Sequence, residues 1–353
     1  MHARSLGQLF QTESNNLNLI RLLAAFSVIY GHASAITGNG PPDIFLQYIG
    51  FKFIGGVAVD AFFVISGFLI TASAASHAGM KYYFASRVLR IYPALTVCIC
   101  FTVFFVGPLL TTSTTYWTSP ATWDYFWKNI TLANTVYNLP GVFENIYSSA
   151  VNGSLWSLYV EVRLYAIVAL VSLVGVLGNR ATFNMIFFAV LVSGFLTPEA
   201  WTFLLAYENH RHVALMFMIG SFAWVNRDGL SLSPWVLLVL LFCAAATHGT
   251  PTFGLVYNLL LPYVVFCLAF CPGGKWFNRF GDYSYGVYLY GWLSQQLIMT
   301  LYPDASNMKN TLLSCMMAFG FAVVSWHLIE KPAMRLRVYF KRQTPMEGHA
   351  KYA

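Results

Sequence analysis

Two ionisable side chains, Arg21 and His32, lie inside one apolar stretch of the chain, residues 17–37. They are eleven residues apart, and eleven helical steps of about 100° end roughly 20° from the start, so a helix would place both on one face, ~16 Å apart along its axis. Ionisable residues in such a segment are costly and usually functional. The alternative is an arginine that extends to the membrane surface and a histidine satisfied by packing.

Two carboxylates extend this pattern. Asp60 lies about six residues into the apolar segment 54–76, and Glu161 lies about seven residues into 154–177. Both segments are expected to run inward from the membrane side nearer His32, which would bring the three groups to one depth. A carboxylate beside an imidazole fixes its tautomer and makes it a better base. A structural ion pair explains the same carboxylates.

Arginines form the second group of charges. Arg87 and Arg90 are three residues apart, so they are neighbours on one helix face, and Pro93 is expected to bend or break that helix just beyond them. Two guanidiniums at a cytoplasmic opening would clamp a phosphate. Ordinary anchoring of a membrane helix explains them as well. With Arg21 at the same level, the pattern suits a long anionic donor whose reactive end lies deep.

The elements that position these residues are membrane helices. The chain has 353 residues, of which 58% are hydrophobic and 9% charged, whereas a soluble domain carries about 25% charged residues. We therefore expect an all-α polytopic membrane helix bundle of about ten transmembrane helices. The apolar segments are about 17–37, 54–76, 88–110, 154–177, 181–197, 212–226, 232–248, 254–271, 283–302 and 309–329.

The distribution of Lys and Arg orients this bundle. Of the 20 Lys and Arg residues, 14 fall on the side of the N-terminus, four fall on the other side, and Arg21 and Arg163 lie within segments. This predicts that both termini are cytoplasmic. The chain is expected to be one integral-membrane domain, 1–353. Its parts outside the segments include a cytoplasmic segment 1–16, a long outer loop 111–153 and a short basic cytoplasmic tail 333–353.

Composition also argues against other partners. The net charge of +7 is explained by the cytoplasmic loops, and no basic-aromatic patch indicates a nucleic-acid partner. The six cysteines lie in or beside apolar segments without metal-ligand spacing. We expect them to be small core residues and expect no metal site.

The outer loop and the segment after it contain a candidate acceptor surface. Trp117, Trp123, Trp127 and Trp156 offer aromatic faces on which sugar rings stack. Anchoring at the membrane interface explains such residues equally well.

Other titratable residues receive a structural interpretation. His210, His212 and His248 lie at the edges of loops and are predicted to be solvated. His327 and Glu330, at the end of the last segment, are predicted to cap or anchor it, with contact to the donor left open.

In their order along the chain, these motifs resemble the acyltransferase-3 family of polytopic membrane acyltransferases, and the resemblance covers nearly the whole chain. Arg21 and His32 meet its R-x10-H pattern. The stretch VDAFFVISGFLI is similar to its second-helix motif, and RVLRIYPAL to its basic element. SLWSLYVEVRLY, FGDYSYGVYLYGW and HLIEKPA also resemble the family. This chain has Gly291 where some members carry a histidine.

The resemblance implies transfer of an acyl group, usually acetyl from acetyl-CoA, to a hydroxyl of a carbohydrate outside the bacterial inner membrane. Acceptors in the family include O-antigen, exopolysaccharide, lipo-oligosaccharide and peptidoglycan sugars. Whether the carbohydrate acceptor of this chain is linked to a lipid is left open by the sequence. The positions that match are His32 as the catalytic histidine, Arg21 as its companion, Asp60 and Glu161 as the acidic positions, and Arg87 and Arg90 as the basic pair for the donor.

The mechanism we expect is general-base catalysis. His32, oriented by Asp60 or Glu161, takes the proton of the acceptor hydroxyl as it attacks the thioester, while Arg21 binds the CoA portion or stabilises developing charge. Transfer through an acylated His32 is the open alternative. The rival class is a multi-pass transporter or flippase of a sugar or lipid-linked oligosaccharide. The absence of repeated halves and the separation of charges by depth favour the enzyme, and a scaffold explains the charges least.

Overall fold

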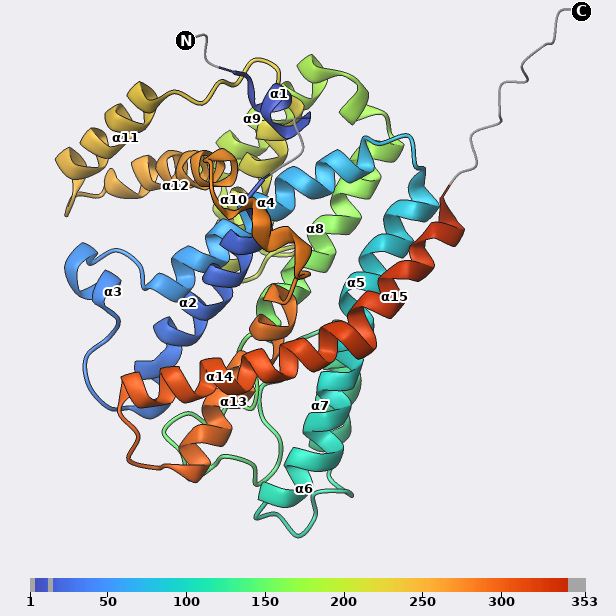
Figure 1. The fold of residues 1–353 in the computed structure, drawn as a ribbon, viewed down its shortest axis with the longest axis vertical. Coiled ribbons are helices and arrows are strands. Elements are labelled where there is room, and N and C mark those ends of the chain that lie inside the picture. Colours follow the sequence, from blue (N-terminus) through green and yellow to red (C-terminus); the bar gives the residue numbers. More distant parts are fainter. Residues whose placement is uncertain (1–3, 12–14, 342–353) are drawn as a thin grey trace, which may run out of the picture.

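The computed structural model describes residues 4–11 and 15–341. In these ranges the chain contains helices and no β-strand, and a single isolated bridge joins Ser5 and Ser231. The first and last described residues lie at the same end of the molecule (Figure 1). The long helices are α2 (Leu17–Thr37), α4 (Ile54–Ala74), α5 (Met80–Phe101), α8 (Leu155–Leu173), α9 (Arg180–Leu196), α10 (Glu208–Val225), α11 (Pro234–Thr247), α12 (Phe253–Phe270), α13 (Ser284–Leu301) and α14 (Asn307–Ser325).

Short helices and turns connect these elements or extend them. They are α1 (Leu6–Gln11), α3 (Ile44–Ile49), α6 (Gly107–Leu110), α7 (Pro120–Thr131), α15 (Lys331–Arg335), the π turns η1 (Thr102–Val106) and η5 (Trp326–Glu330), and the 3₁₀ turns η2 (Val176–Gly178), η3 (Pro198–Trp201), η4 (Gly274–Arg279) and η6 (Leu336–Phe340). The predicted outer loop therefore contains the helix α7. Within the predicted tail, the structure describes residues 333–341, and residues 342–353 lie outside the described part.

The all-helical prediction is confirmed, and each predicted apolar segment falls on a helix. Within the described part of the chain, six helices are long and apolar enough to cross a membrane: Leu17–Thr37, Ile54–Ala74, Met80–Leu110, Leu155–Leu173, Phe253–Phe270 and Asn307–Phe340. The apolar helices α9 and α11 are shorter, and the more polar α10 and α13 are not among the six. Ten crossings and the direction of the termini therefore remain predictions.

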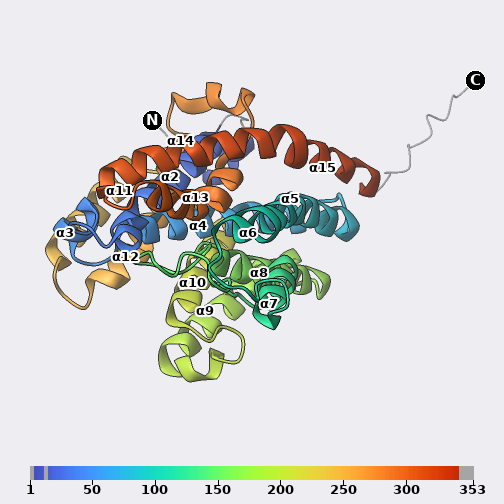
Figure 2. The same ribbon diagram turned by 90° about the horizontal axis from the view of Figure 1, so that it is seen from below.

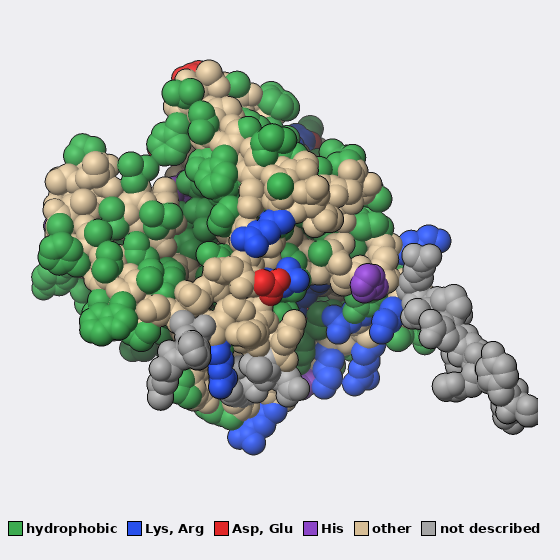
Figure 3. Space-filling model, turned by 90° about the horizontal axis from the view of Figure 1, so that it is seen from above, with side chains coloured by type: hydrophobic (Ala, Val, Ile, Leu, Met, Phe, Trp, Pro, Cys, Tyr) green, Lys and Arg blue, Asp and Glu red, His purple; other side chains and the backbone are tan. Residues whose placement is uncertain are grey.

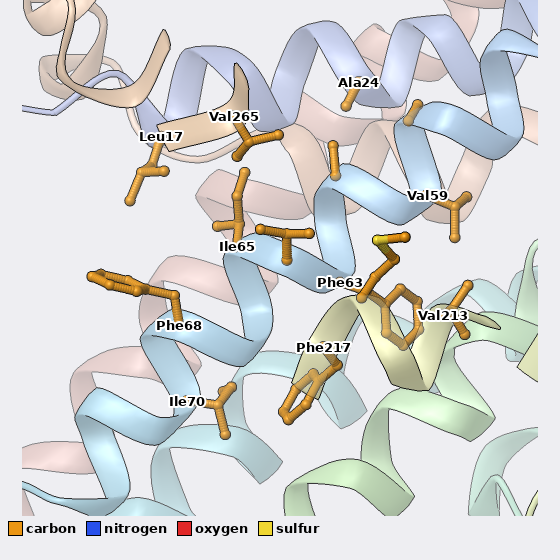
Figure 4. Close-up of a cluster of buried hydrophobic side chains, with 14 of the residues drawn as sticks. Leu17, Ala24, Val59, Phe63, Ile65, Phe68, Ile70, Val213, Phe217 and Val265 are labelled. Atoms are coloured by element: carbon orange, nitrogen blue, oxygen red, sulfur yellow. The ribbon is translucent and has the colours of Figure 1, made fainter. Parts of the chain in front are cut away.

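Helix α4 forms the centre of the bundle and packs against α2 and α10. In Figure 4 its side chains Phe63 and Phe68 lie in the same buried cluster as Phe217 of α10. Small residues set the approach of the two helices: a Cβ at Gly67 would come within 1.9 Å of the Phe217 carbonyl oxygen, and one at Gly220 within 2.1 Å of the Val64 carbonyl oxygen. Only glycine fits at these crossings.

Helix α5 extends beyond the predicted apolar segment at its start and continues through the proline inside it. The helix begins at Met80 rather than near residue 88, so Arg87 and Arg90 lie in its second and third turns. Pro93 does not break the helix, which continues to Phe101. A proline removes one backbone hydrogen bond, but neighbouring helices can hold an apolar membrane helix together around it.

The remaining helices surround this centre asymmetrically. Viewed from below, α14 lies along one side of the molecule, while α8, α9 and α10 lie on the opposite side (Figure 2). Helix α13 packs between α2 and α14. The helices α2, α4, α8 and α13 therefore have inward faces on which side chains from distant parts of the sequence meet.

Candidate active site

The end of the bundle that carries Arg21, Arg87 and Arg90, here called the arginine end, contains a carboxylate that the sequence analysis did not single out. Asp282 Oδ2 accepts one hydrogen bond from Arg21 Nη1 and one from Arg90 Nη2, both at 2.6 Å. Its Oδ1 accepts from the backbone N–H and the hydroxyl of Ser284. Asp282 thus ties α2 and α5 to the start of α13.

Asp282 is ionised at any physiological pH. Burial would raise the pKa of its carboxyl, but Arg21 and Arg90, together with the hydrogen bonds from Ser284, lower it to about 2. A depressed carboxyl pKa adds stability above the ordinary pKa near 4, and that stability is lost only as the pH falls toward 2.

A second carboxylate completes the arginine end. Glu330, in the π turn η5, is 1% exposed. Its Oε2 lies 3.5 Å from Arg90 Nη1, and its Oε1 accepts a hydrogen bond from the Ser325 hydroxyl at 2.9 Å. The residue therefore links α14 to α5, which specifies the anchoring role predicted for it.

A cavity of about 260 Å³ begins among these side chains and runs between α4, α8 and α13. Figure 3 shows that Lys and Arg side chains gather over this end of the molecule. On α4 the cavity extends from Ile70 to Val59, a length of ~16 Å. Its charged and hydroxyl-bearing lining residues are Arg21, Ser66, Ser86, Arg87, Arg90, Ser157, Glu161, Tyr165, Asp282, Ser284, Tyr285, Tyr288 and Arg337.

The cavity arginines differ in their partners. Arg21 and Arg90 are held by Asp282, whereas Arg87 forms no ion pair with any described carboxylate. Its guanidinium lies 5.9 Å from the centre of the Tyr165 ring, and its Nε is buried without a hydrogen-bond partner. An unpaired guanidinium with a free donor facing a cavity is an anion-binding group.

Glu161 lies halfway along the cavity. It accepts a hydrogen bond from the Ser66 hydroxyl at 2.8 Å and another from the Tyr165 hydroxyl. The Ser66 hydroxyl thus belongs to the cavity wall. At the deep end, the Ser157 and Tyr288 hydroxyls are hydrogen-bonded to each other.

His32 lies just beyond this deep end. Its Nδ1 is 2.8 Å from the Val28 carbonyl oxygen, and its ring packs edge-on against Phe53 and Trp292, with centroid distances of 5.0 Å. A Cβ on Gly55 would lie 3.4 Å from Nδ1, so His32 sits beside Gly55. Gly55 precedes the cavity residue Val59 by one helical turn, and Trp292 comes one turn after Tyr288, which puts His32 ~6 Å beyond the cavity.

The predicted alignment of Arg21 and His32 is confirmed by their contacts. Arg21 binds Asp282 at the start of α13, and the His32 ring touches Trp292 within α13. One face of α2 therefore presents both side chains to the same neighbouring helix.

Asp60 lies outside this cavity lining and is 0% exposed. Its Oδ2 accepts hydrogen bonds from Lys52 Nζ at 2.6 Å and the Tyr257 hydroxyl at 2.6 Å, and lies 3.1 Å from His212 Nε2. Its Oδ1 is buried without a partner. His212 was predicted to be solvated, and this was wrong because the residue faces α4.

The predicted common depth of the three acid–base groups was also wrong. His32 lies beside Gly55, and Glu161 beside Ser66, and these α4 positions are ~16 Å apart along the helix. Counting residues from each helix end fails because the helices begin at different heights. Neither Asp60 nor Glu161 hydrogen-bonds to His32 in the described chain. The Val28 carbonyl, and not a carboxylate as expected, orients the His32 ring.

The four candidate acceptor tryptophans fall into two places. Trp117, Trp123 and Trp127 pack around the aromatic rings of Phe104 and Phe126 at the junction of η1 and α7.

Trp156 instead stacks on His210, with ring planes 6° apart and centroids 5.5 Å apart. His210 is 8% exposed, so its predicted solvation was wrong, whereas His248 is exposed as predicted.

The part of the predicted outer loop, residues 111–153, that approaches His32 is its last stretch. Trp292 Nε1 donates to the Ala150 carbonyl at 2.8 Å, and Gly153 lies against the Trp292 ring. Gln296 donates to the carbonyl oxygens of Ser148 and Ala150. Residues 148–153 thus cover α13, whose Trp292 packs against the His32 ring. The tryptophan pattern in the sequence did not indicate this contact.

Comparison with known proteins gives this arrangement a family. The family model described as "Acyltransferase domain" (acyltransferase-3) matches residues 14–330. The chain belongs to the acyltransferase-3 family. The predicted resemblance is therefore confirmed, and of the enzyme and transporter classes that the sequence left open, the family match supports the acyltransferase.

Two curated relatives of this acyltransferase align over most of their length. An "O-acetyl transferase" of Shigella phage Sf6 is 26% identical over 339 residues, which cover 90% of this chain and 96% of the relative. "Nodulation protein 10" of Rhizobium leguminosarum bv. viciae is 27% identical over 354 residues, covering 92% and 94%. No solved structure matches significantly. Together with the six described helices that are long and apolar enough to cross a membrane, family membership marks the chain as an integral membrane acyltransferase.

Proposed function

We propose that this acyltransferase moves an acetyl group from cytoplasmic acetyl-CoA to a hydroxyl of a carbohydrate on the outer side of a bacterial inner membrane. The observation that carries the proposal is the single cavity that joins four arginines at one end to a point one helical turn from His32 at the other. The O-acetyl transferase of phage Sf6 supports acetyl as the acyl group and oxygen as its acceptor.

The residues at the arginine end fit the phosphates of CoA. Arg87 has a buried Nε with no partner, and Arg337 lies at the exposed rim of the cavity. Arg21 and Arg90 are neutralised by Asp282 and Glu330, so they hold the helices in place around the cavity. The donor supplies an activated thioester, and the narrow cavity between α4 and α8 would direct that end toward His32.

His32 is set up to act through one nitrogen. A carbonyl oxygen only accepts hydrogen bonds, so Nδ1 carries the proton shared with Val28, and the neutral ring presents a lone pair at Nε2. Nε2 takes the proton of the acceptor hydroxyl as its oxygen forms the ester bond to the acyl carbon, and that proton then passes to the departing thiolate. The relay through an acylated His32 uses the same nitrogen and remains the alternative mechanism.

For the acceptor, the geometry favours a different surface from the tryptophan-rich part of the outer loop. Residues 148–153 cover α13 next to His32, and Trp156 begins the following helix. We propose that the sugar enters between this stretch and the α3–α4 connection that carries Phe53.

The test is acetyl transfer from labelled acetyl-CoA in membrane vesicles, measured for the native chain and for His32→Ala at equal abundance. General-base catalysis is typically worth 10²- to 10⁴-fold, so transfer should fall by about that factor. His248→Ala, an exposed histidine bonded only to the Ile49 carbonyl, is the matched control and should retain transfer. Full transfer by His32→Ala would refute the role of His32 in the mechanism. A native chain that releases no CoA from acetyl-CoA would refute the proposed acetyltransferase activity.

A further inference from the structure

A second cavity, of about 560 Å³, lies on the other side of α8, between α8, α9 and α10. The two cavities use different faces of this helix: Ser157 and Glu161 border the first, whereas Leu164 and Val168 border the second. The second cavity, here called the α8–α10 groove, is lined almost entirely by aliphatic and aromatic side chains. The helices α8, α9 and α10 that line it lie on the side of the molecule opposite α14 (Figure 2).

One end of the groove has a polar character. This end is formed by η3 and the start of α10, where Trp201, Glu208 and Arg211 line it. The Trp201 Nε1 is buried with no acceptor. Arg211 donates only to the carbonyl oxygens of Leu205 and Ala206, at 3.3 and 3.4 Å, and pairs with no described carboxylate.

The charges at this end favour an anion. Glu208 lies in the first turn of α10, where the partial positive charge of the helix N-terminus stabilises a carboxylate. Nearby, Arg163 donates to the Leu204 carbonyl at 3.1 Å and also lacks a carboxylate partner among the described residues. Glu199 in η3 brings the nearby carboxylates to two, equal in number to the arginines, but neither arginine forms an ion pair with a described carboxylate. The Arg211 guanidinium and the Trp201 Nε1 therefore remain as donors for a phosphate.

The polar end of the groove is connected to His32 by direct contacts. His212 lines the groove and lies 3.1 Å from Asp60 Oδ2, the same oxygen that Lys52 binds at 2.6 Å. The residue after Lys52, Phe53, packs against the His32 ring. A ligand headgroup held at this end would therefore sit beside the elements that position His32.

We propose that the α8–α10 groove binds the hydrocarbon chain of the acceptor, a saccharide linked to a lipid phosphate, and that Arg211 and Trp201 bind the phosphate. This inference rests on the proposed function and specifies its acceptor. A free saccharide does not fit the groove because its hydroxyls would be buried without partners. Hydrocarbon gains little on leaving a bilayer for an apolar groove, so selectivity comes from the polar end.

The test uses a long-chain prenyl diphosphate that carries a photoactivatable group on its chain, added to the full-length protein in phosphatidylcholine nanodiscs. Native protein should show saturable labelling of peptides from residues 164–221, and excess phosphatidylglycerol should not compete. A Cβ at Gly194 meets no atom within 4 Å, so Gly194→Phe fills the groove without a clash. Labelling should fall at least tenfold in Gly194→Phe and in Arg211→Gln.

The matched control is Gly320→Phe, because Gly320 lies on α14, outside the groove, and also has open space around its Cβ. It should label like the native chain. Equal labelling of all variants, or full competition by phosphatidylglycerol, would overturn the proposal in favour of an ordinary bilayer lipid. Labelling needs no chemistry, so His32→Ala should still be labelled. Loss of transfer with intact labelling would therefore contradict the proposed mechanism and not the groove proposal. Intact transfer without labelling would contradict the groove proposal and not the proposed function.

Discussion

Asp282 and Asp60 are both carboxylates inside an apolar bundle, and each gathers several donors on one oxygen, yet they occupy different places. Asp282 borders the cavity at the arginine end, is 13% exposed and holds two arginines. Asp60 is fully buried, lies away from that cavity and holds Lys52, His212 and Tyr257. A charged side chain inside the bundle therefore does not by itself indicate a substrate contact. The better criterion is whether the side chain lines a cavity.

The largest effect is expected at the fully buried carboxylate. Asp60→Ala leaves Lys52, His212 and Tyr257 without their acceptor in a buried site, and breaking a buried pair typically costs about 3–5 kcal/mol. Thermal unfolding in detergent should show this loss. Asp282→Ala should cost less, because the Asp282 side chain is itself 13% exposed whereas Asp60 is 0% exposed. An equal loss in both variants would contradict the contrast between the two sites.

The next effect separates paired from unpaired arginines. Arg87→Gln should raise the donor KM about tenfold, equivalent to about 1.4 kcal/mol, and leave the unfolding temperature unchanged. Arg90→Gln should lower the unfolding temperature, because it removes one of the two arginine partners of Asp282 and the arginine partner of Glu330. Steady-state kinetics with acetyl-CoA and thermal unfolding measure the two effects.

Arg335→Gln is the control for these variants, because it removes an exposed arginine that does not line the cavity. It should change neither quantity. If Arg87→Gln lowered stability as Arg90→Gln does, Arg87 would be another structural arginine and not the phosphate ligand.

A smaller effect compares two tyrosines one turn apart on α13. The Tyr288 hydroxyl bonds with Ser157 at the deep end of the cavity, and the Tyr285 hydroxyl donates to the Ile91 carbonyl at 2.9 Å near the arginines. Replacing either with Phe removes about 1 kcal/mol of hydrogen bonding. Both variants should lose similar stability, but only Tyr288→Phe should lower kcat, by about fivefold. Equal kcat values would mean that the deep end is not where the acyl group reacts.

The smallest effect is expected in the outer tryptophans. Trp127→Ala should leave the acceptor KM within about twofold of native, because Trp127 is 59% exposed and packs on Phe126 away from His32. Trp156→Ala removes a ring stacked on His210, an interaction worth about 0.5–1.5 kcal/mol, and should raise the acceptor KM several-fold. Acceptor titrations at fixed acetyl-CoA measure both. The reverse order would place the sugar on the tryptophan-rich part of the loop.

Local periodicity in the sequence was enough to predict the helices and one aligned pair of side chains. The helical character of the apolar segments and the shared face of Arg21 and His32 depend only on hydropathy and on 3.6 residues per turn. The position of Asp282 does not, because its partner Arg21 lies 261 residues away. A weak signal was present, since Asp282 is an acidic residue just before an apolar helix that begins with serine.

The predictions of the site were wrong where they depended on the position of one helix relative to another along the bundle axis. Asp60 and Glu161 were placed beside His32 by counting from helix ends, but α2, α4 and α8 start at different levels. His212 was assigned to solvent because it is near a loop, although α10 turns it toward Asp60, 152 residues away. Such contacts depend on how helices pack, which a single sequence does not specify.

The π turn at residues 326–330 fixes the rotational phase of the helical segment after it. A π turn accommodates one residue more than an α-helical turn, and one residue corresponds to about 100° of rotation. Deleting a single residue there would restore regular winding and swing the downstream helix by more than a quarter circle. Met334 and Arg337 would then turn away from the cavity mouth that they now line. The number of residues in this π turn therefore determines whether the Arg337 side chain faces the cavity mouth.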